Sequence, residues 1–187
     1  AVDLIVRGEG VESFKEVLCS FLGTGPGLAS TKGITFRGNN GIVNTDPRPP
    51  FANLDEIPSP YVTGILIPRD EVTYIETFRG CPYRCAFCYE GKNFTELRFF
   101  SDERVKKEIE LIMSIKSIRS FHIVDSVFNL KKDRLSRLVH LISDANRSGT
   151  SIRTVEIMAE LVDHEVVQLL QKAQVVSVET GPQTVNR

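Results

Sequence analysis

Residues 72–89 have the sequence VTYIETFRGCPYRCAFCY, and this stretch decides the fold. Its first seven residues are mostly β-branched and aromatic, which predicts a strand over Val72–Phe78. Cys81, Cys85 and Cys88 follow almost at once, with the spacing Cys-x3-Cys-x2-Cys. The C-terminal ends of parallel strands are where α/β folds place their functional loops. The stretch therefore predicts a cysteine-bearing loop at the functional end of a parallel sheet.

Downstream of this loop, strands alternate with helices. Ser101 is suited to cap the first of these helices, because its hydroxyl can accept a hydrogen bond from a free backbone amide. Helical crossovers of this length imply parallel strands, and continuous apolar runs imply burial on both faces. The pattern predicts an α/β sheet that is either doubly wound or curved into the first part of a TIM-like barrel. The expected strands are 72–78, 121–125, 152–158 and 175–179, and the expected helices are 101–117, 133–145 and 163–173.

The N-terminal part has a different character. A short apolar strand over 1–6 and a helix over 12–22 make half of an α/β unit, with Phe14, Val17, Leu18 and Phe21 expected on one helix face. A small hairpin is expected at 34–43, around an Asn-Asn-Gly turn. Prolines then exclude regular helix up to Pro68. A connector this long favours a domain junction, so we expect domains over 1–27 and 71–187, with a proline-rich connector over 28–70.

Composition excludes several classes of protein. The chain has 187 residues, 41% of them hydrophobic and 25% charged, and a formal net charge of −1. This balance gives no basis for nucleic-acid or anionic-membrane binding. No apolar stretch approaches the roughly 20 residues that span a bilayer, and no secretion signal is visible. We therefore expect a cytoplasmic protein, and both chain ends resemble cut points of a longer one.

Three cysteines within eight positions are not a disulfide framework, since such frameworks use dispersed cysteines in short secreted chains. Three soft thiolates in one loop can bind three irons of a cubane cluster. A missing fourth ligand leaves one iron open. Cys19 lies far away in sequence and is expected to be a small buried hydrophobe. The alternatives are a structural zinc site, which usually has four ligands, and a ferredoxin-like electron carrier.

The loop resembles the radical S-adenosylmethionine superfamily, whose Cys-x3-Cys-x-aromatic-Cys motif is matched by Cys81, Cys85, Phe87 and Cys88. The resemblance implies a 4Fe–4S cluster whose open iron chelates S-adenosylmethionine. One electron then cleaves the sulfonium to give methionine and a 5′-deoxyadenosyl radical. It implies a low-potential electron donor such as a flavodoxin or ferredoxin, and it places Phe87 and Tyr89 near the cofactor.

Two further segments, 155–163 and 178–186, resemble the third and fourth barrel strands of one branch of that superfamily. The branch includes oxygen-independent coproporphyrinogen oxidases, methylthiotransferases and cobalamin-dependent enzymes. The resemblance implies that Glu156, Glu179 and Gln183 line the adenosylmethionine pocket. The alternative is that Glu156 pairs with a basic neighbour and Gln183 caps a turn. Asp125 and Ser126 end the second strand and are expected at the same rim.

Residues 2–14 resemble the last strand, turn and helix of a cobalamin-binding domain, and 53–61 resemble the connector that follows it. The implied architecture is a partial radical SAM barrel preceded by the end of a Rossmann-like domain. The leading hypothesis is an enzyme that modifies or methylates an unknown substrate, with cobalamin bound in the full-length protein. The alternative is a non-catalytic structural module, stabilised by zinc or by an iron–sulfur cluster without an open iron.

Overall fold

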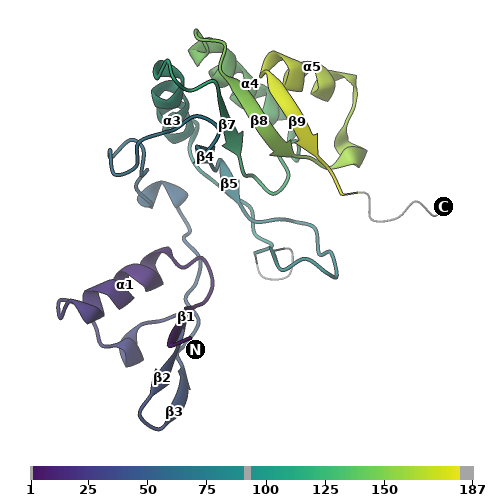
Figure 1. The fold of residues 1–187 in the computed structure, drawn as a ribbon. Coiled ribbons are helices and arrows are strands. Elements are labelled where there is room, and N and C mark those ends of the chain that lie inside the picture. The colour runs from purple at the N-terminus through teal and green to yellow at the C-terminus, as the bar shows by residue number, and fades with distance from the viewer. Residues whose placement is uncertain (1, 91–93, 182–187) are drawn as a thin grey trace. The chain divides into compact units, whose positions relative to one another are not determined.

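The computed structural model describes residues 2–90 and 94–181 (Figure 1). The chain forms two compact units, Ala1–Ala52 and Asn53–Arg187. Within the described residues, no helix is both long and apolar enough to cross a bilayer.

The first unit is a three-stranded antiparallel sheet with one helix. It contains β1 (Leu4–Val6), α1 (Val11–Phe21), the 3-10 turn η1 (Leu28–Ser30), β2 (Ile34–Gly38) and β3 (Gly41–Asn44). The predicted hairpin is confirmed as β2 and β3, and β2 also pairs with β1. The hairpin therefore belongs to the same sheet as the N-terminal strand. The parallel pairing typical of a Rossmann-like domain is not seen among the described strands of this unit, and the assignment of 1–27 to such a domain stays a prediction.

Helix α1 forms where it was predicted, but its apolar face is mostly uncovered. Val17 is buried, whereas Phe14, Leu18 and Phe21 are 54%, 46% and 72% exposed. The predicted helical spacing is present, but only Val17 of these four residues is covered within this unit. A three-stranded sheet gives the helix too few partners to cover its whole apolar stripe.

The second unit is built on a four-stranded parallel sheet in the order β4-β7-β8-β9. Its strands are β4 (Tyr74–Ile75), β7 (Ser120–Ile123), β8 (Ser151–Glu156) and β9 (Val175–Glu179). The connecting helices are α3 (Asp102–Ser114), α4 (Lys132–Ala145) and α5 (His164–Lys172). The unit also contains the 3-10 turns η2 (Leu54–Glu56) and η3 (Ala159–Leu161). The predicted alternation of strands and helices is confirmed.

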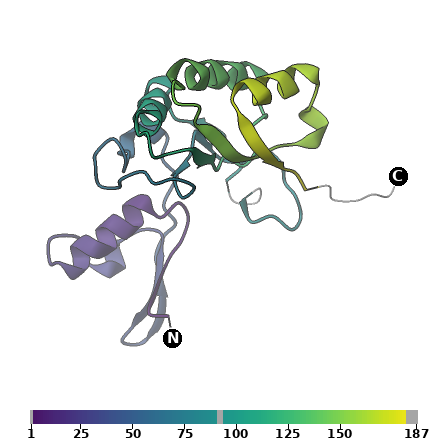
Figure 2. The same ribbon diagram turned by 45° about the horizontal axis from the view of Figure 1, so that its top comes forward.

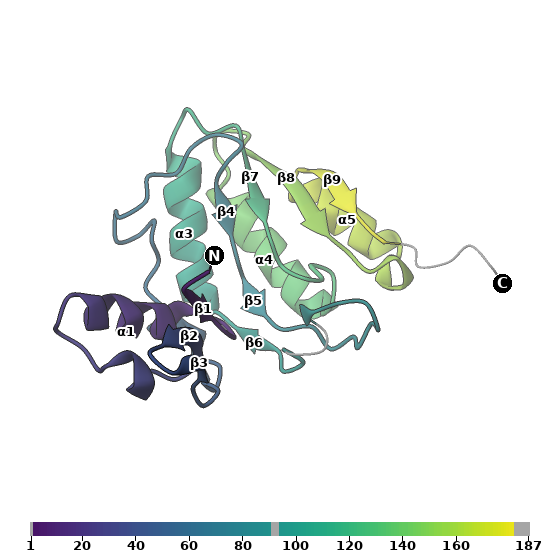
Figure 3. The ribbon, with the colours of Figure 1, turned by 60° about the horizontal axis from the view of Figure 1, so that its bottom comes forward.

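Helices α3, α4 and α5 lie on one face of the sheet (Figures 2 and 3). A doubly wound sheet carries helices on both faces, whereas the wall of a (β/α) barrel carries them only outside. The arrangement therefore fits the barrel alternative. The core between sheet and helices is fully apolar at its centre, where Phe121, Ile109, Leu135 and Val139 are each 0% exposed. Burying each such side chain stabilises the fold by about 1.5–3 kcal/mol.

Local capping explains where two of the helices begin. The hydroxyl of Ser101 accepts a hydrogen bond from the Arg104 amide at 3.1 Å, as the sequence predicts. Asp163 plays the same role for α5 and accepts from the Val166 amide at 2.9 Å. Asp163 is therefore the cap of this helix and not its first residue.

The strand predicted over Val72–Phe78 is divided into two. It forms β4 (Tyr74–Ile75) and then β5 (Phe78–Arg79), which pairs antiparallel with β6 (Arg98–Phe99). The break falls at Thr77, whose amide donates to the carboxylate of Asp125. The Asp125 side chain, which follows the end of β7, accepts the hydrogen bond that the backbone of a neighbouring strand would otherwise accept. The backbone hydrogen bonds between the strands therefore stop at this point.

Candidate functional site

The cysteine loop, residues 80–90, starts directly after β5. The β5–β6 ribbon closes its base, and the rings of Phe78 and Phe99 lie 5.5 Å apart between centroids. The Cys81 amide donates to the carbonyl of Phe94 at 2.8 Å. The first cysteine of the motif therefore has a fixed backbone position.

Gly80 permits the sharp entry into this loop. Its φ is +100°, and a Cβ atom placed there would lie 2.1 Å from the carbonyl oxygen of Glu96. Only glycine fits, because both the backbone angle and the space exclude a side chain. The Gly80 carbonyl accepts a hydrogen bond from the hydroxyl of Ser126 at 2.9 Å.

Asp125 holds the strand that leads into the loop. One carboxylate oxygen accepts from the amides of Thr77 at 2.6 Å and Phe78 at 3.3 Å, and the other accepts from the Thr77 hydroxyl. The side chain is 1% exposed, and burial raises its pKa to about 6 against the opposing effect of these hydrogen bonds. The predicted cofactor contact of Asp125 stays a prediction, and in the structure its carboxylate binds the end of the strand. Arg134 completes the anchor by donating to the Thr77 carbonyl at 2.7 Å.

All three cysteines of the loop are free thiols. Cys81 is buried, and burial raises the pKa of its thiol, with the charges of Glu90 and Cys88 acting in the same direction. The pKa of Tyr83 is raised by burial, by Glu160, and by the charges of Cys81 and Cys85. Among the motif cysteines, Cys88 thus lies close enough for its charge to act on Cys81.

The donor set fits an iron–sulfur cluster. Thiolates are the ligands that such clusters use, and the cysteines lie in a loop secured at its base. Within residues 2–90 and 94–181, no three Cys, His, Asp or Glu side chains converge on a point where one metal ion could sit. Ligands of a cubane bind different irons and need not converge on one point.

Carboxylates gather where the strands end. We call Glu76, Glu90, Glu156 and Glu179 the acidic cluster. Glu156 and Glu179 are register partners on β8 and β9, and the pKa of Glu156 is raised by burial and by Glu179. The pKa of Glu90 is raised by burial and by the charges of Glu156 and Glu76. The structure thus brings the predicted Glu156 and Glu179 together with the cysteine loop through Glu90. Glu76 also pairs with Arg79 at 2.9 Å.

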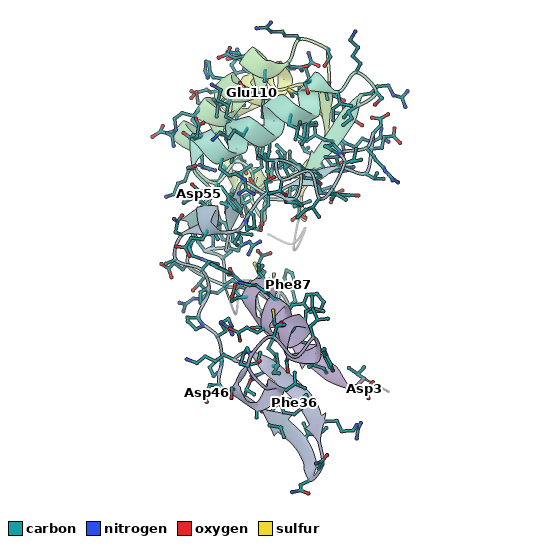
Figure 4. All side chains as sticks on the ribbon, turned by 90° about the vertical axis from the view of Figure 1, so that its left-hand side faces the viewer. Asp3, Phe36, Asp46, Asp55, Phe87 and Glu110 are labelled. Atoms are coloured by element: carbon teal, nitrogen blue, oxygen red, sulfur yellow. The ribbon has the colours of Figure 1, made fainter. Side chains whose placement is uncertain are left out.

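The remaining residues that were predicted to contact the cofactor are Phe87, Tyr89 and Gln183. Phe87 and Tyr89 are 70% and 69% exposed on the loop, and Figure 4 labels Phe87. The ring of Tyr89 meets Phe94 edge-on at 6.3 Å. Gln183 lies outside the described residues, so its predicted role stays a prediction.

Thr77 and Glu90 were not among the predicted site residues. Thr77 carried no motif signal, because its importance comes from a hydrogen bond across 48 positions. Glu90 comes two residues after the last cysteine of the motif, and this position in the sequence indicates a place beside the cluster ligands. Any carboxylate so close to the motif is held near the thiolates by the chain itself.

The chain is similar to known proteins over most of its length. The family model described as "Radical SAM superfamily" matches residues 75–187, which is more than half of the chain. An uncharacterized methyltransferase of Pyrococcus horikoshii is 35% identical over 141 residues, covering 71% of this chain and 30% of that protein. The cobalamin-dependent radical SAM methyltransferase TokK of Streptomyces tokunonensis is 30% identical, covering 83% of this chain and 24% of its own length.

Among solved structures, a radical S-adenosylmethionine methyltransferase, TsrM from Kitasatospora setae, was determined with cobalamin and a 4Fe–4S cluster bound. It superimposes with a TM-score of 0.73 at 20% identity, covering 98% of this chain and 38% of the other. This likeness supports the α/β fold class expected from sequence. The chain spans about a quarter to a third of the length of the two curated relatives.

Proposed function

The chain belongs to the radical SAM superfamily, and on that premise we propose that it is the cluster-binding part of a radical SAM methyltransferase. One observation carries the proposal: three free cysteines in the superfamily spacing lie in a loop fixed at the C-terminal end of the first parallel strand. When bound, the cluster supplies the electron that cleaves the sulfonium of S-adenosylmethionine. The substrate that is modified is not identified.

The residues of this chain have distinct parts in the proposal. Cys81, Cys85 and Cys88 hold the cluster. Glu156 and Glu179 line the pocket of S-adenosylmethionine, whose sulfonium is positively charged. Because the charge of Glu179 and burial raise the pKa of Glu156, a nearby cation would relieve the repulsion between the two carboxylates. The exposed aromatic rings of Phe87 and Tyr89 and, beyond the described residues, Gln183 complete the pocket.

Cobalamin use in the full-length protein belongs to the same proposal. It is supported by the description of TokK as cobalamin-dependent and by the resemblance of residues 2–14 to the end of a cobalamin-binding domain. In this scheme, the cobalamin-binding domain ends with residues 1–27. Residues 28–70 connect it to the barrel, and the barrel begins with residues 71–187. The electron comes from a flavodoxin or ferredoxin, and a reducing cytoplasm keeps the thiols free.

The test is anaerobic reconstitution of the full-length gene product with iron and sulfide, followed by addition of S-adenosylmethionine and dithionite. The expected products are 5′-deoxyadenosine or S-adenosylhomocysteine, the second reporting methyl transfer. The Cys88→Ala variant should form neither product, whereas the matched Cys19→Ala variant should behave as the wild type. Absence of both products from protein with a full complement of iron and sulfide would contradict the proposal.

Metal analysis separates this function from a structural metal module. The proposal requires about four irons and four acid-labile sulfides per chain. One zinc and no sulfide would support a structural staple instead.

A further inference from the structure

The end of β8 is held by the loop between β7 and α4. Among the described residues, the register pairs between β7 and β8 stop at Phe121 and Ile152. Beyond this point the chain after β7 turns toward Thr77, to which Asp125 is hydrogen-bonded. Backbone N–H and C=O groups at the edge of the core need hydrogen-bond partners. The last part of β8, which ends at Glu156, therefore needs a partner other than β7 on that side.

Asn129, in this loop, supplies that partner. Its side-chain nitrogen donates to the Met158 carbonyl at 3.0 Å, and its side-chain oxygen accepts from the Met158 amide at 2.9 Å. The side-chain amide thus binds Met158 as a backbone residue of a neighbouring strand would. Beside it, the amide of Phe128 donates to the carbonyl of Glu156 at 2.7 Å. Asn129 is 2% exposed, so its two hydrogen bonds are shielded from water.

The other side of the same segment is bonded to β9. The amide of Ile157 donates to the carbonyl of Glu179 at 2.9 Å, and Glu156 and Glu179 are register partners. The backbone of residues 156–158 is thus fixed from both sides, by β9 and by the loop that carries Asn129. This backbone sets the position from which the Glu156 carboxylate extends.

We propose that Asn129 is a positioning residue for S-adenosylmethionine binding: it fixes the backbone of residues 156–158 and so holds the Glu156 carboxylate at the pocket. The inference rests on the proposed function, because it assumes that Glu156 lines that pocket. Asn129 acts through Glu156 and is not itself assigned a contact with the ligand. A carboxylate on a backbone that is already fixed loses less conformational entropy when a cation binds, so it contributes more to affinity.

The experiment is a double-mutant cycle on the affinity for S-adenosylmethionine, measured by equilibrium dialysis with the reconstituted full-length gene product. We expect Asn129→Ala to weaken the affinity about fivefold, because the Glu156 carboxylate remains but is less well held. Glu156→Gln alone should cost about tenfold. If Asn129 acts through Glu156, the variant with both changes should also lose only about tenfold, whereas independent effects would multiply to about fiftyfold.

Asn146→Ala is the matched control. Asn146 makes the same pair of hydrogen bonds to one backbone residue, donating to the Thr150 carbonyl at 2.7 Å and accepting from the Thr150 amide at 2.9 Å. Thr150 directly precedes β8, at the end of the strand opposite to Glu156. Positioning of Glu156 predicts a loss of affinity for Asn129→Ala and none for Asn146→Ala. Equal losses in the two variants would show that any weakened backbone contact has this effect, and would overturn the assignment.

The outcomes separate the two proposals. Wild-type protein that holds no cluster, or that binds no S-adenosylmethionine, overturns the proposed function itself. Unchanged affinity in Asn129→Ala, or a loss of about fiftyfold in the variant with both changes, overturns only the role of Asn129. If Asn129→Ala fails to load the cluster, Asn129→Leu takes its place in the cycle, because leucine fills a similar volume but makes neither hydrogen bond. Failure of both variants to load would show that Asn129 supports the fold of the loop, and would overturn its assignment to Glu156.

Discussion

The carboxylate of Asp125 accepts a hydrogen bond from the amide of Thr77 at 2.6 Å, across 48 positions of sequence. This contact ends the first parallel strand and aims the chain into the cysteine loop. The same carboxylate accepts from Phe78, three residues before Cys81. One buried side chain thereby sets the path of the chain as it enters the candidate site.

Asp125→Ala should destabilise the fold strongly. It leaves the buried amides of Thr77 and Phe78 without their acceptor, which costs about 2–4 kcal/mol in free energy of unfolding. Urea denaturation of the apoprotein measures this change, with exposed Asp144→Ala as the control that should stay within about 0.5 kcal/mol of wild type. Equal losses of unfolding free energy in the two variants would show that Asp125 does not anchor the strand.

The raised pKa of Asp125 predicts that the free energy of unfolding depends on pH. Its pKa of about 6 in the folded state lies above the ordinary 3.8, so between these values the folded state binds a proton that the unfolded chain does not. Stability contributed by this group therefore falls as pH rises from about 4 to about 6, by roughly 3 kcal/mol in total, and is constant above that window. Asp125→Asn cannot titrate and should lack this component. Parallel pH profiles for wild type and Asp125→Asn would show that the group does not titrate in this range.

Gly80→Ala should disrupt the entry to the loop. The added Cβ would lie 2.1 Å from the Glu96 carbonyl oxygen, and the positive φ adds backbone strain of about 1–3 kcal/mol. Gly149→Ala is the matched control, because Gly149 also has a positive φ of +74° but nothing lies within 4 Å of its added Cβ. We expect Gly80→Ala to lose most of its reconstituted iron and Gly149→Ala to keep it. Full iron content in both variants would show that the close approach at Gly80 is unimportant for cluster loading.

Glu156→Gln should weaken binding of S-adenosylmethionine without affecting the cluster. Removing the charge of this partly buried carboxylate at the strand end should cost about tenfold in affinity for the cationic S-adenosylmethionine. Equilibrium dialysis with the reconstituted protein measures it. Glu110→Gln, an exposed carboxylate on α3 labelled in Figure 4, is the control and should bind as the wild type does. An unchanged affinity for Glu156→Gln would leave Glu156 outside the pocket.

The sequence predicted the strands and helices of the second unit well because their apolar periodicity is local and strong. Helix α4 was expected over 133–145 and is found at Lys132–Ala145. The break between β4 and β5 was not predictable in this way. It is caused by Asp125, a residue that belongs to another strand, and local patterns contain no information on that contact.

The residues of the candidate site likewise differ in whether the local sequence predicts them. The cysteines are recognisable because their spacing is fixed by one loop. Glu156 and Glu179 are recognisable because segments 155–163 and 178–186 resemble known barrel strands. The roles of Thr77 and Ser126 depend on hydrogen bonds to residues 48 and 46 positions away. Phe14, Leu18 and Phe21 show the reverse case, where a correct periodicity predicts a helix but not what covers it.

The central claim is that three cysteines hold a cluster with an iron open to S-adenosylmethionine. The most direct measurement is the electron paramagnetic resonance spectrum of the reduced, reconstituted full-length gene product, recorded before and after adding S-adenosylmethionine. We predict a one-electron cluster signal that changes on addition, and no such signal from the Cys81→Ala, Cys85→Ala or Cys88→Ala variants. A cluster signal that S-adenosylmethionine leaves unchanged, or no cluster signal at all, would contradict the account.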